Sequence, residues 1–82
     1  MHRTVVVHIL ETDGSPKPAA DVSLQLHAVV EGVALEPKTT DKDGVAQFSL
    51  DMEKYAELTI YVAGHERVSR GPIQDEYYIT VN

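Results

Sequence analysis

The chain has 82 residues with 7 Lys or Arg against 13 Asp or Glu, which gives a net charge of −6, and it contains no cysteine. A chain this short supports one domain, residues 1–82, because a core of this size cannot be divided. The acidic balance disfavours nucleic acid, whose binding depends on clustered cations, and the lack of cysteine excludes disulfides and thiol nucleophiles. No apolar run approaches the roughly 18 residues that a membrane span requires.

The first predicted strand covers residues 4–11, where Val5, Val7 and Ile9 recur with the period of two that is typical of a strand. A loop follows over residues 12–18, because an Asp-Gly pair favours a turn and two prolines lack backbone donors.

The clearest alternation predicts the next strand over residues 22–30. Its inward side chains are Val22, Leu24, Leu26, Ala28 and Val30. After a turn at residues 31–32 the chain returns as an irregular strand over 33–40. Pro37 indicates an edge position for it, because proline cannot donate to the ladder.

A second tight turn at residues 41–44 precedes a strand with inward Ala46, Phe48 and Leu50. Residues 51–55 are compatible with one helical turn that has Asp51 as its N-cap.

Two further segments complete the pattern of short strands. In the first, Leu58, Ile60 and Val62 point inward. A bend at residues 64–65 and a short, weak strand around Val68 follow it. In the last segment, Tyr77, Ile79 and Val81 point inward. Turn residues recur about every 8–12 residues, as in β-sandwiches. We therefore predict an all-β, antiparallel Greek-key β-sandwich of about seven strands, prealbumin-like or Ig-like.

Five residues are candidate binding residues. Tyr61 and Tyr78 alternate out of register with their inward neighbours, so each is expected to present its ring on a sheet surface, where it can anchor a partner or form a cross-strand aromatic pair. His65, Arg67 and Arg70 form a polar cluster near a bend. The alternative for this cluster is a solvated loop in which the arginines offset nearby acids.

Metal sites are not expected. The four histidines lack the close spacing of zinc sites, and we expect His8 and His27 to meet as a polar pair across neighbouring strands. Residues 41–44 superficially resemble part of a calcium loop. However, Thr39 and Leu50 would occupy its first and twelfth positions, so two essential carboxylates are missing. We also expect no cofactor.

Three segments, residues 13–24, 39–50 and 58–65, carry a family resemblance. Their Gly-x-Pro turn, Thr-Asp-x-x-Gly turn and late glycine corner resemble carboxypeptidase regulatory-like domains, and they are similar to bacterial Ig-like adhesin repeats and Cna-B modules. The resemblance implies a spacer, adhesion or docking module of a larger protein. We therefore predict a non-enzymatic structural or protein-interaction module, monomeric, with a protein partner or neighbouring domains, and cell-surface or extracellular if it is part of a larger protein.

Many Cna-B modules join a first-strand lysine to a last-strand asparagine. Here Asn82 is present, but the first strand has no lysine and Lys17 lies in the following loop, so we expect no such crosslink.

A second resemblance starts at residues 8–11, which are similar to the opening of transthyretin-related 5-hydroxyisourate hydrolases and imply a catalytic role for His8. That family carries an arginine after its Asp-Gly turn, where this chain has Val45, and it ends in Tyr-Arg-Gly-Ser, where this chain has Thr-Val-Asn. A degenerate hydrolase relative is therefore one alternative, and a carbohydrate-binding module is another.

Overall fold

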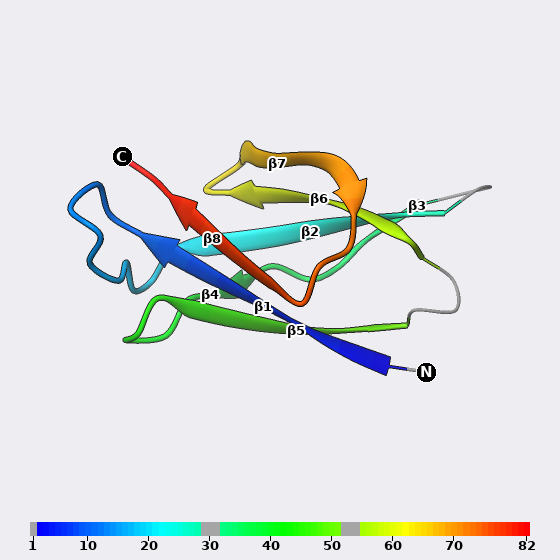
Figure 1. The fold of residues 1–82 in the computed structure, drawn as a ribbon, viewed down its shortest axis with the longest axis horizontal. Helices are drawn as coiled ribbons and strands as arrows, with labels where there is room; N and C mark the ends of the chain where they lie inside the picture. Colours follow the sequence, from blue (N-terminus) through cyan, green and yellow to red (C-terminus); the bar gives the residue numbers. More distant parts are fainter. Residues whose placement is uncertain (1, 29–31, 52–54) are drawn as a thin grey trace.

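The computed structural model describes residues 2–28, 32–51 and 55–82, and these residues form eight β-strands (Figure 1). The strands are β1 His2–Leu10, β2 Asp21–His27, β3 Gly32–Ala34, β4 Lys38–Thr39, β5 Val45–Asp51, β6 Glu57–Val62, β7 His65–Pro72 and β8 Glu76–Thr80. The described residues contain no helix, which confirms the prediction of an all-β fold.

The strands form two sheets that pack as a β-sandwich. One sheet, here called sheet A, has the order β5-β1-β8, and the other, sheet B, has the order β3-β2-β6-β7, with β4 also paired to β2. The chain passes between the sheets four times, since β1, β5 and β8 lie in sheet A and the segments between them lie in sheet B. This alternation brings strands that are distant in sequence into one layer.

One strand pair departs from the antiparallel arrangement that the sequence predicts. Strands β1 and β8 are parallel, with Val6 opposite Glu76 and Leu10 opposite Thr80. A parallel pair needs a long crossover connection, and here the whole of β2 to β7 supplies it. No local sequence pattern reports this direction, because the partners are joined only through the rest of the fold.

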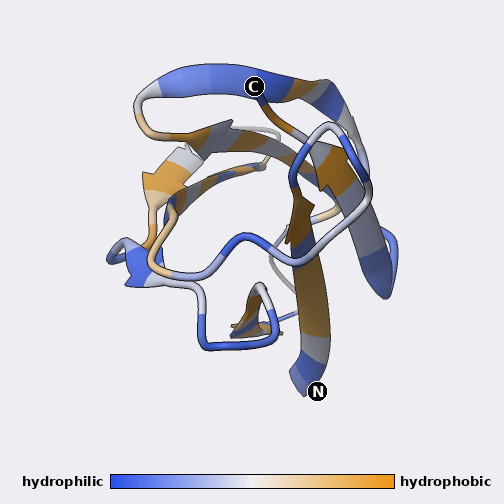
Figure 2. Ribbon diagram, turned by 90° about the vertical axis from the view of Figure 1, so that its left-hand side faces the viewer, coloured by the Kyte–Doolittle hydropathy of each residue, from blue (hydrophilic) through white to orange (hydrophobic). Residues whose placement is uncertain are grey.

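The core lies between the two sheets. Strands β1, β2, β5, β6 and β8 contribute alternate side chains to it, and Figure 2 shows the resulting bands of hydrophobic and hydrophilic residues along the ribbons. Most of the inward residues predicted from the alternation are buried, including Phe48, which is 2% exposed. Ala28 is an exception, since it lies beyond the end of β2 and is half-buried, and Val30 lies outside the described residues. The largest fully buried side chains are Phe48, Ile9, Leu24, Leu26, Leu50, Leu58, Ile60, Val5, Val7 and Val22.

The predicted strand over residues 33–40 is instead two short strands, β3 and β4, both beside β2 at the margin of sheet B. Pro37 lies between them and supplies no N–H, which explains both the interruption and the predicted edge position.

Three other boundaries differ from the sequence prediction. Strand β2 ends at His27, and residues 29–31 lie outside the described part of the chain. The helical turn proposed after Asp51 falls on residues 52–54, which also lie outside it. Strand β7 has eight residues, more than predicted, and its pairing with β6 contains register shifts on either side of Ile60.

Candidate functional site

A pocket of about 440 Å³ opens at one end of the sandwich. It is formed where the loop before β2, the β6–β7 hairpin and the residues after β8 come together. Its lining residues are Lys17, Ala19, Ala20, Asp21, Val62, Ala63, His65, Arg67, Val81 and Asn82. Its volume falls in the range of small-molecule sites.

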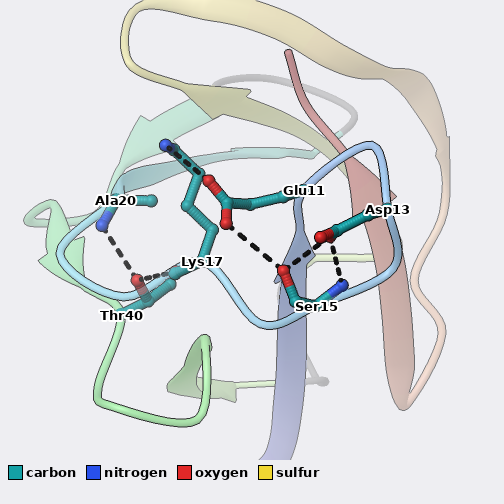
Figure 3. Close-up of polar contacts among 6 residues, drawn as sticks. All are labelled: Glu11, Asp13, Ser15, Lys17, Ala20 and Thr40. Carbon is teal, nitrogen blue, oxygen red and sulfur yellow. Dashed lines mark hydrogen bonds and ion pairs between the residues drawn. The ribbon is translucent and has the colours of Figure 1, made fainter.

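The loop that forms one wall is held by a buried threonine. Thr40 is 5% exposed; its Oγ1 accepts a hydrogen bond from Ala20 N at 2.9 Å and donates one to Lys17 O at 2.8 Å (Figure 3). Lys17 N also donates to Ile9 O at 2.9 Å. These bonds satisfy the buried hydroxyl, so the backbone of Lys17 is fixed while its side chain extends outward.

A polar chain outside the pocket continues from the same lysine. Glu11 Oε1 lies 3.9 Å from Lys17 Nζ, and the Ser15 hydroxyl lies 3.3 Å from Glu11 Oε2 and 2.6 Å from Asp13 Oδ1 (Figure 3). The hydroxyl and then the backbone N–H of Ser15 hold the pKa of Asp13 below its ordinary value. The Glu11 contact is long for a hydrogen bond, so the Lys17 ammonium keeps donors for another acceptor.

Two alanines at the pocket have left-handed backbone conformations. Ala19 has φ 58° and Ala63 has φ 51°. Each costs about 1–2 kcal/mol relative to a right-handed residue, because the Cβ crowds the following carbonyl. The Ala63 N–H donates to Asp21 O at 2.8 Å, and this bond fixes the β6–β7 hairpin against β2. Strain of this kind clusters at functional sites, and here both instances line one cavity.

The predicted cluster of His65, Arg67 and Arg70 divides into two environments. His65 and Arg67 line the pocket, whereas Arg70 Nε donates to Glu57 Oε1 at 2.8 Å on the sheet surface. Arg70 thus follows the solvated alternative, in which the arginine offsets an acid. Arg67 has no ion-pair partner within residues 2–28, 32–51 and 55–82.

The Tyr78 ring lies on the outer surface of sheet A, as predicted, and is 64% exposed. It stacks on the His8 ring with centroids 4.2 Å apart and planes 6° apart, and its hydroxyl donates to Glu76 Oε2 at 2.8 Å. This hydrogen bond, and then the negative charge of Glu76, raises the pKa of Tyr78. His8 Nε2 lies 3.6 Å from the same carboxylate oxygen, beyond hydrogen-bond distance, and has no hydrogen-bond partner in the described part of the chain.

Tyr61 does not join this group. It lies on β6 in sheet B, opposite Ser23 on one side and Glu66 on the other, and its side chain is half-buried. The fold therefore places the two tyrosines on different sheets, and neither lines the pocket with His65 and Arg67.

The expected contact between His8 and His27 is wrong. His8 lies on β1 in sheet A, whereas His27 lies on β2 in sheet B and its Nε2 is 2.8 Å from the hydroxyl of Thr59. The prediction assumed that strands adjacent in sequence pair with each other, but β1 and β2 belong to opposite layers. Thr59 is 3% exposed, so this bond satisfies a buried hydroxyl.

Across the described ranges, no group of three or more His, Asp or Glu side chains is placed to hold a metal ion. The Asp41 carboxylate accepts hydrogen bonds from Asp43 N at 2.9 Å and Val45 N at 3.0 Å, so it closes the tight turn that leads from β4 in sheet B to β5 in sheet A. These same ranges hold no helix that could cross a bilayer.

Comparison of the sequence with protein families and with curated proteins finds no match. The residues of the pocket that sequence reasoning missed are Lys17, Asp21 and the two strained alanines. Lys17 stands out only as a cation in a proline-rich loop, and nothing in its neighbours reports that it lies near β7.

Proposed function

We propose that this chain is a non-enzymatic, monomeric protein-interaction module, prealbumin-like or Ig-like, whose end pocket receives an acidic group of a partner protein or neighbouring domain. The observation that carries the proposal is the convergence of Lys17, His65 and Arg67 on one pocket, with the Arg67 guanidinium unpaired among the described residues.

The chemistry of these side chains favours a carboxylate. A guanidinium presents planar, parallel N–H donors that match the two oxygens of a carboxylate, and Lys17, which also lines the pocket, carries a second cation with its Nζ 3.9 Å from Glu11 Oε1. Buried Ala20, Val62 and Val81 supply an apolar floor for the short aliphatic stem of a Glu or Asp side chain.

Local charge supports the same occupant. Lys17 and Arg67 bring two positive charges to the pocket, but Asp21 lies in the lining and Glu11 lies 3.9 Å from Lys17 Nζ, so the cation that remains without a partner among the described residues is Arg67, in a chain of net charge −6. A focused cation in an acidic protein directs an anionic group to one place on the surface.

The surroundings of His8 support the non-enzymatic part of the proposal. The residue directly opposite His8 on β5 is Val45, the position at which the hydrolase resemblance implies an arginine. A catalytic imidazole also requires a group that stabilises developing negative charge; Val45 is apolar, and Glu76, whose Oε2 lies 3.6 Å from His8 Nε2, is itself an acid, so neither supplies one.

Two peptides that differ in one charge test the pocket. We expect acetyl-Ala-Glu-Ala-amide, titrated to millimolar concentration, to shift the backbone amide resonances of Ala20, Ala63 and Arg67. We expect the analogue with Gln in place of Glu to leave them unchanged. Arg67→Gln should abolish the shifts, because it removes the guanidinium but keeps an uncharged polar side chain.

Arg70→Gln is the matched control, since Arg70 lies on the same strand but outside the pocket. Equal loss of binding in both variants would mean that only the overall charge matters. Equal shifts with both peptides, or none with either, would contradict a carboxylate pocket.

A second candidate function, carbohydrate binding, is favoured by the exposed Tyr78 ring. His8 covers one face of this ring, so the opposite face is available to stack on the apolar face of a sugar. A glycan array gives the measurement, and loss of binding in Tyr78→Ala but not in Tyr61→Ala is the expected result. Absence of glycan binding, or unchanged binding in Tyr78→Ala, would remove this candidate.

A further inference from the structure

The outer edges of the two sheets differ in how well they are protected from pairing with other strands. In sheet B, β3 and β4 have three and two residues, and β7 carries charged side chains and register shifts. In sheet A, β8 has five residues and begins with the acidic Glu76. Short length, charge and irregular pairing are the means by which proteins keep an edge from adding strands.

Strand β5, the other edge of sheet A, lacks these features. It has seven residues and pairs with β1 in an uninterrupted register. Its sequence from Val45 to Leu50 contains no charged residue and no proline. The side chains of Gln47 and Ser49 are exposed and uncharged.

The register identifies the backbone groups that face outward. Ile9 N donates to Gly44 O at 2.8 Å, so these two opposed residues form a hydrogen-bonded pair. In an antiparallel ladder such pairs recur at every second residue, and the register of β1 and β5 therefore gives the other bonded pairs. Phe48 therefore bonds to β1. The N–H and C=O groups of Gln47 and Ser49 point away from β1 and have no partner within the described residues.

The turn before β5 sets one limit of this open segment. Val45 N donates to the Asp41 carboxylate, and Asp41 N donates to Val45 O at 3.0 Å, so the outward groups of Val45 are already paired. The free hydrogen-bonding groups begin at Gln47.

We infer that the open edge of β5, at Gln47 and Ser49, is a docking site for an extended, cationic segment of a partner protein, which adds a fourth strand to sheet A. Four backbone hydrogen bonds, two at each residue, fix the position of the added strand.

Charge determines the kind of strand that fits. The acids near this edge are Asp41 and Asp43, which precede β5, and Asp51, which ends it. Lys42 and Lys38 offset part of the negative charge of these acids. The Nζ of Lys38 lies 5.5 Å from the centroid of the Phe48 ring. The chain as a whole carries −6. A strand with basic residues beside the acidic turn is attracted to this edge.

A second copy of the chain fits less well. Two β5 strands that pair antiparallel around Phe48 place Gln47 opposite Ser49, but they also bring the acidic ends of both strands together between two chains of −6 charge. Like charges at directly opposed or diagonal positions destabilise a strand pair.

This docking site is separate from the end pocket, because no residue of β5 lines that pocket. The two proposals can therefore fail independently.

Amide hydrogen exchange followed by NMR tests the inference. In the free chain we expect the amides of Gln47 and Ser49 to exchange rapidly and those of Phe48 and Leu50 slowly. At millimolar concentration, the peptide acetyl-Lys-Thr-Val-Thr-Val-Thr-Lys-amide should protect Gln47 and Ser49. The same peptide with Glu in place of both Lys should protect them less.

Charge variants at Ser49 separate the proposed site from general attraction. Ser49→Lys should weaken binding of the lysine peptide and Ser49→Glu should strengthen it, each by about threefold, the effect of one exposed charge pair. Thr80→Lys is the matched control, because it places the same charge on β8, the opposite edge of sheet A, and should change binding less than Ser49→Lys.

Three results would overturn the inference. They are the absence of protection at Gln47 and Ser49 by either peptide, equal effects of Ser49→Lys and Thr80→Lys, and a doubled solution mass with both amides protected before any peptide is added. The last result would assign the edge to a second copy of this chain.

Discussion

Strands β5 and β7 are both edge strands, but β5 is stabilised by buried side chains, whereas β7 is mostly exposed and carries charged ones. In β5, three alternate side chains are buried, Ala46, Phe48 and Leu50, whereas β7 contributes half-buried Val68 to the core and is otherwise largely exposed. The β7 ribbon along the top of Figure 2 is mostly hydrophilic.

The difference shows how one small fold divides its surface. A strand that is fixed by a buried face needs no charged side chains for stability, and β5 carries none between Val45 and Leu50. A strand with little buried surface carries charged side chains, and two of them, His65 and Arg67, reach the end pocket. The pocket residues His65 and Arg67 therefore lie on the strand that the core holds least.

The largest expected effect tests the core attachment of the two strands. Phe48→Ala should lower the free energy of unfolding by about 3–5 kcal/mol, because it empties a fully buried site. Val68→Ala should cost only about 1 kcal/mol, since Val68 is half-buried. Urea denaturation of both variants gives the comparison, and similar losses would mean that β7 is anchored as firmly as β5.

The turns that lead into these strands give the next test. Gly44 has φ 74° and an added Cβ would lie 2.6 Å from Ile9 O, whereas Gly64 has φ 81° and no atom within 4 Å of that position. Gly64→Ala should cost about 1–2 kcal/mol from the backbone conformation alone. Gly44→Ala should cost about 2–5 kcal/mol, because the chain must also shift to relieve the contact.

Thermal melts of both glycine variants, with calorimetric enthalpies, measure this difference. Equal losses would show that Ile9, Pro16 and Lys17 move away from the added Cβ without measurable cost.

The smallest expected effect is a gain in stability at the β7 turn. Ala63→Gly should stabilise the chain by about 0.5–1 kcal/mol, because relief of the left-handed alanine exceeds the added chain entropy of glycine. Ala34→Gly is the control, since Ala34 lies in β3 with no positive φ and should only lose stability. A melt in which Ala63→Gly loses stability as well would mean that Ala63 is not strained.

Much of the fold follows from local sequence, and particular residues show why. The alternation that includes Val22, Leu24 and Leu26 determines which face is buried, because side chains in a strand point to opposite sides. Glycines in the turns likewise act within a few residues, so the strand breaks near them could be predicted. Pro37 indicated the edge position, but the break between β3 and β4 was not predicted. The outward position of Tyr78 follows from the same period of two.

The partners of these strands depend on the whole chain. How the two sheets bury their inner faces together decides which layer each strand joins. It also decides the parallel pairing of β1 with β8 and the separation of His8 from His27. The same packing brings Lys17 to a pocket with Arg67, 50 positions later in the sequence (67 − 17 = 50), and leaves Gln47 and Ser49 on an open edge. Alternation and turn residues are local properties, so the sequence alone determined the strands and their buried faces. Contacts between distant strands minimise exposed apolar surface over the entire molecule, and only the tertiary structure decided those.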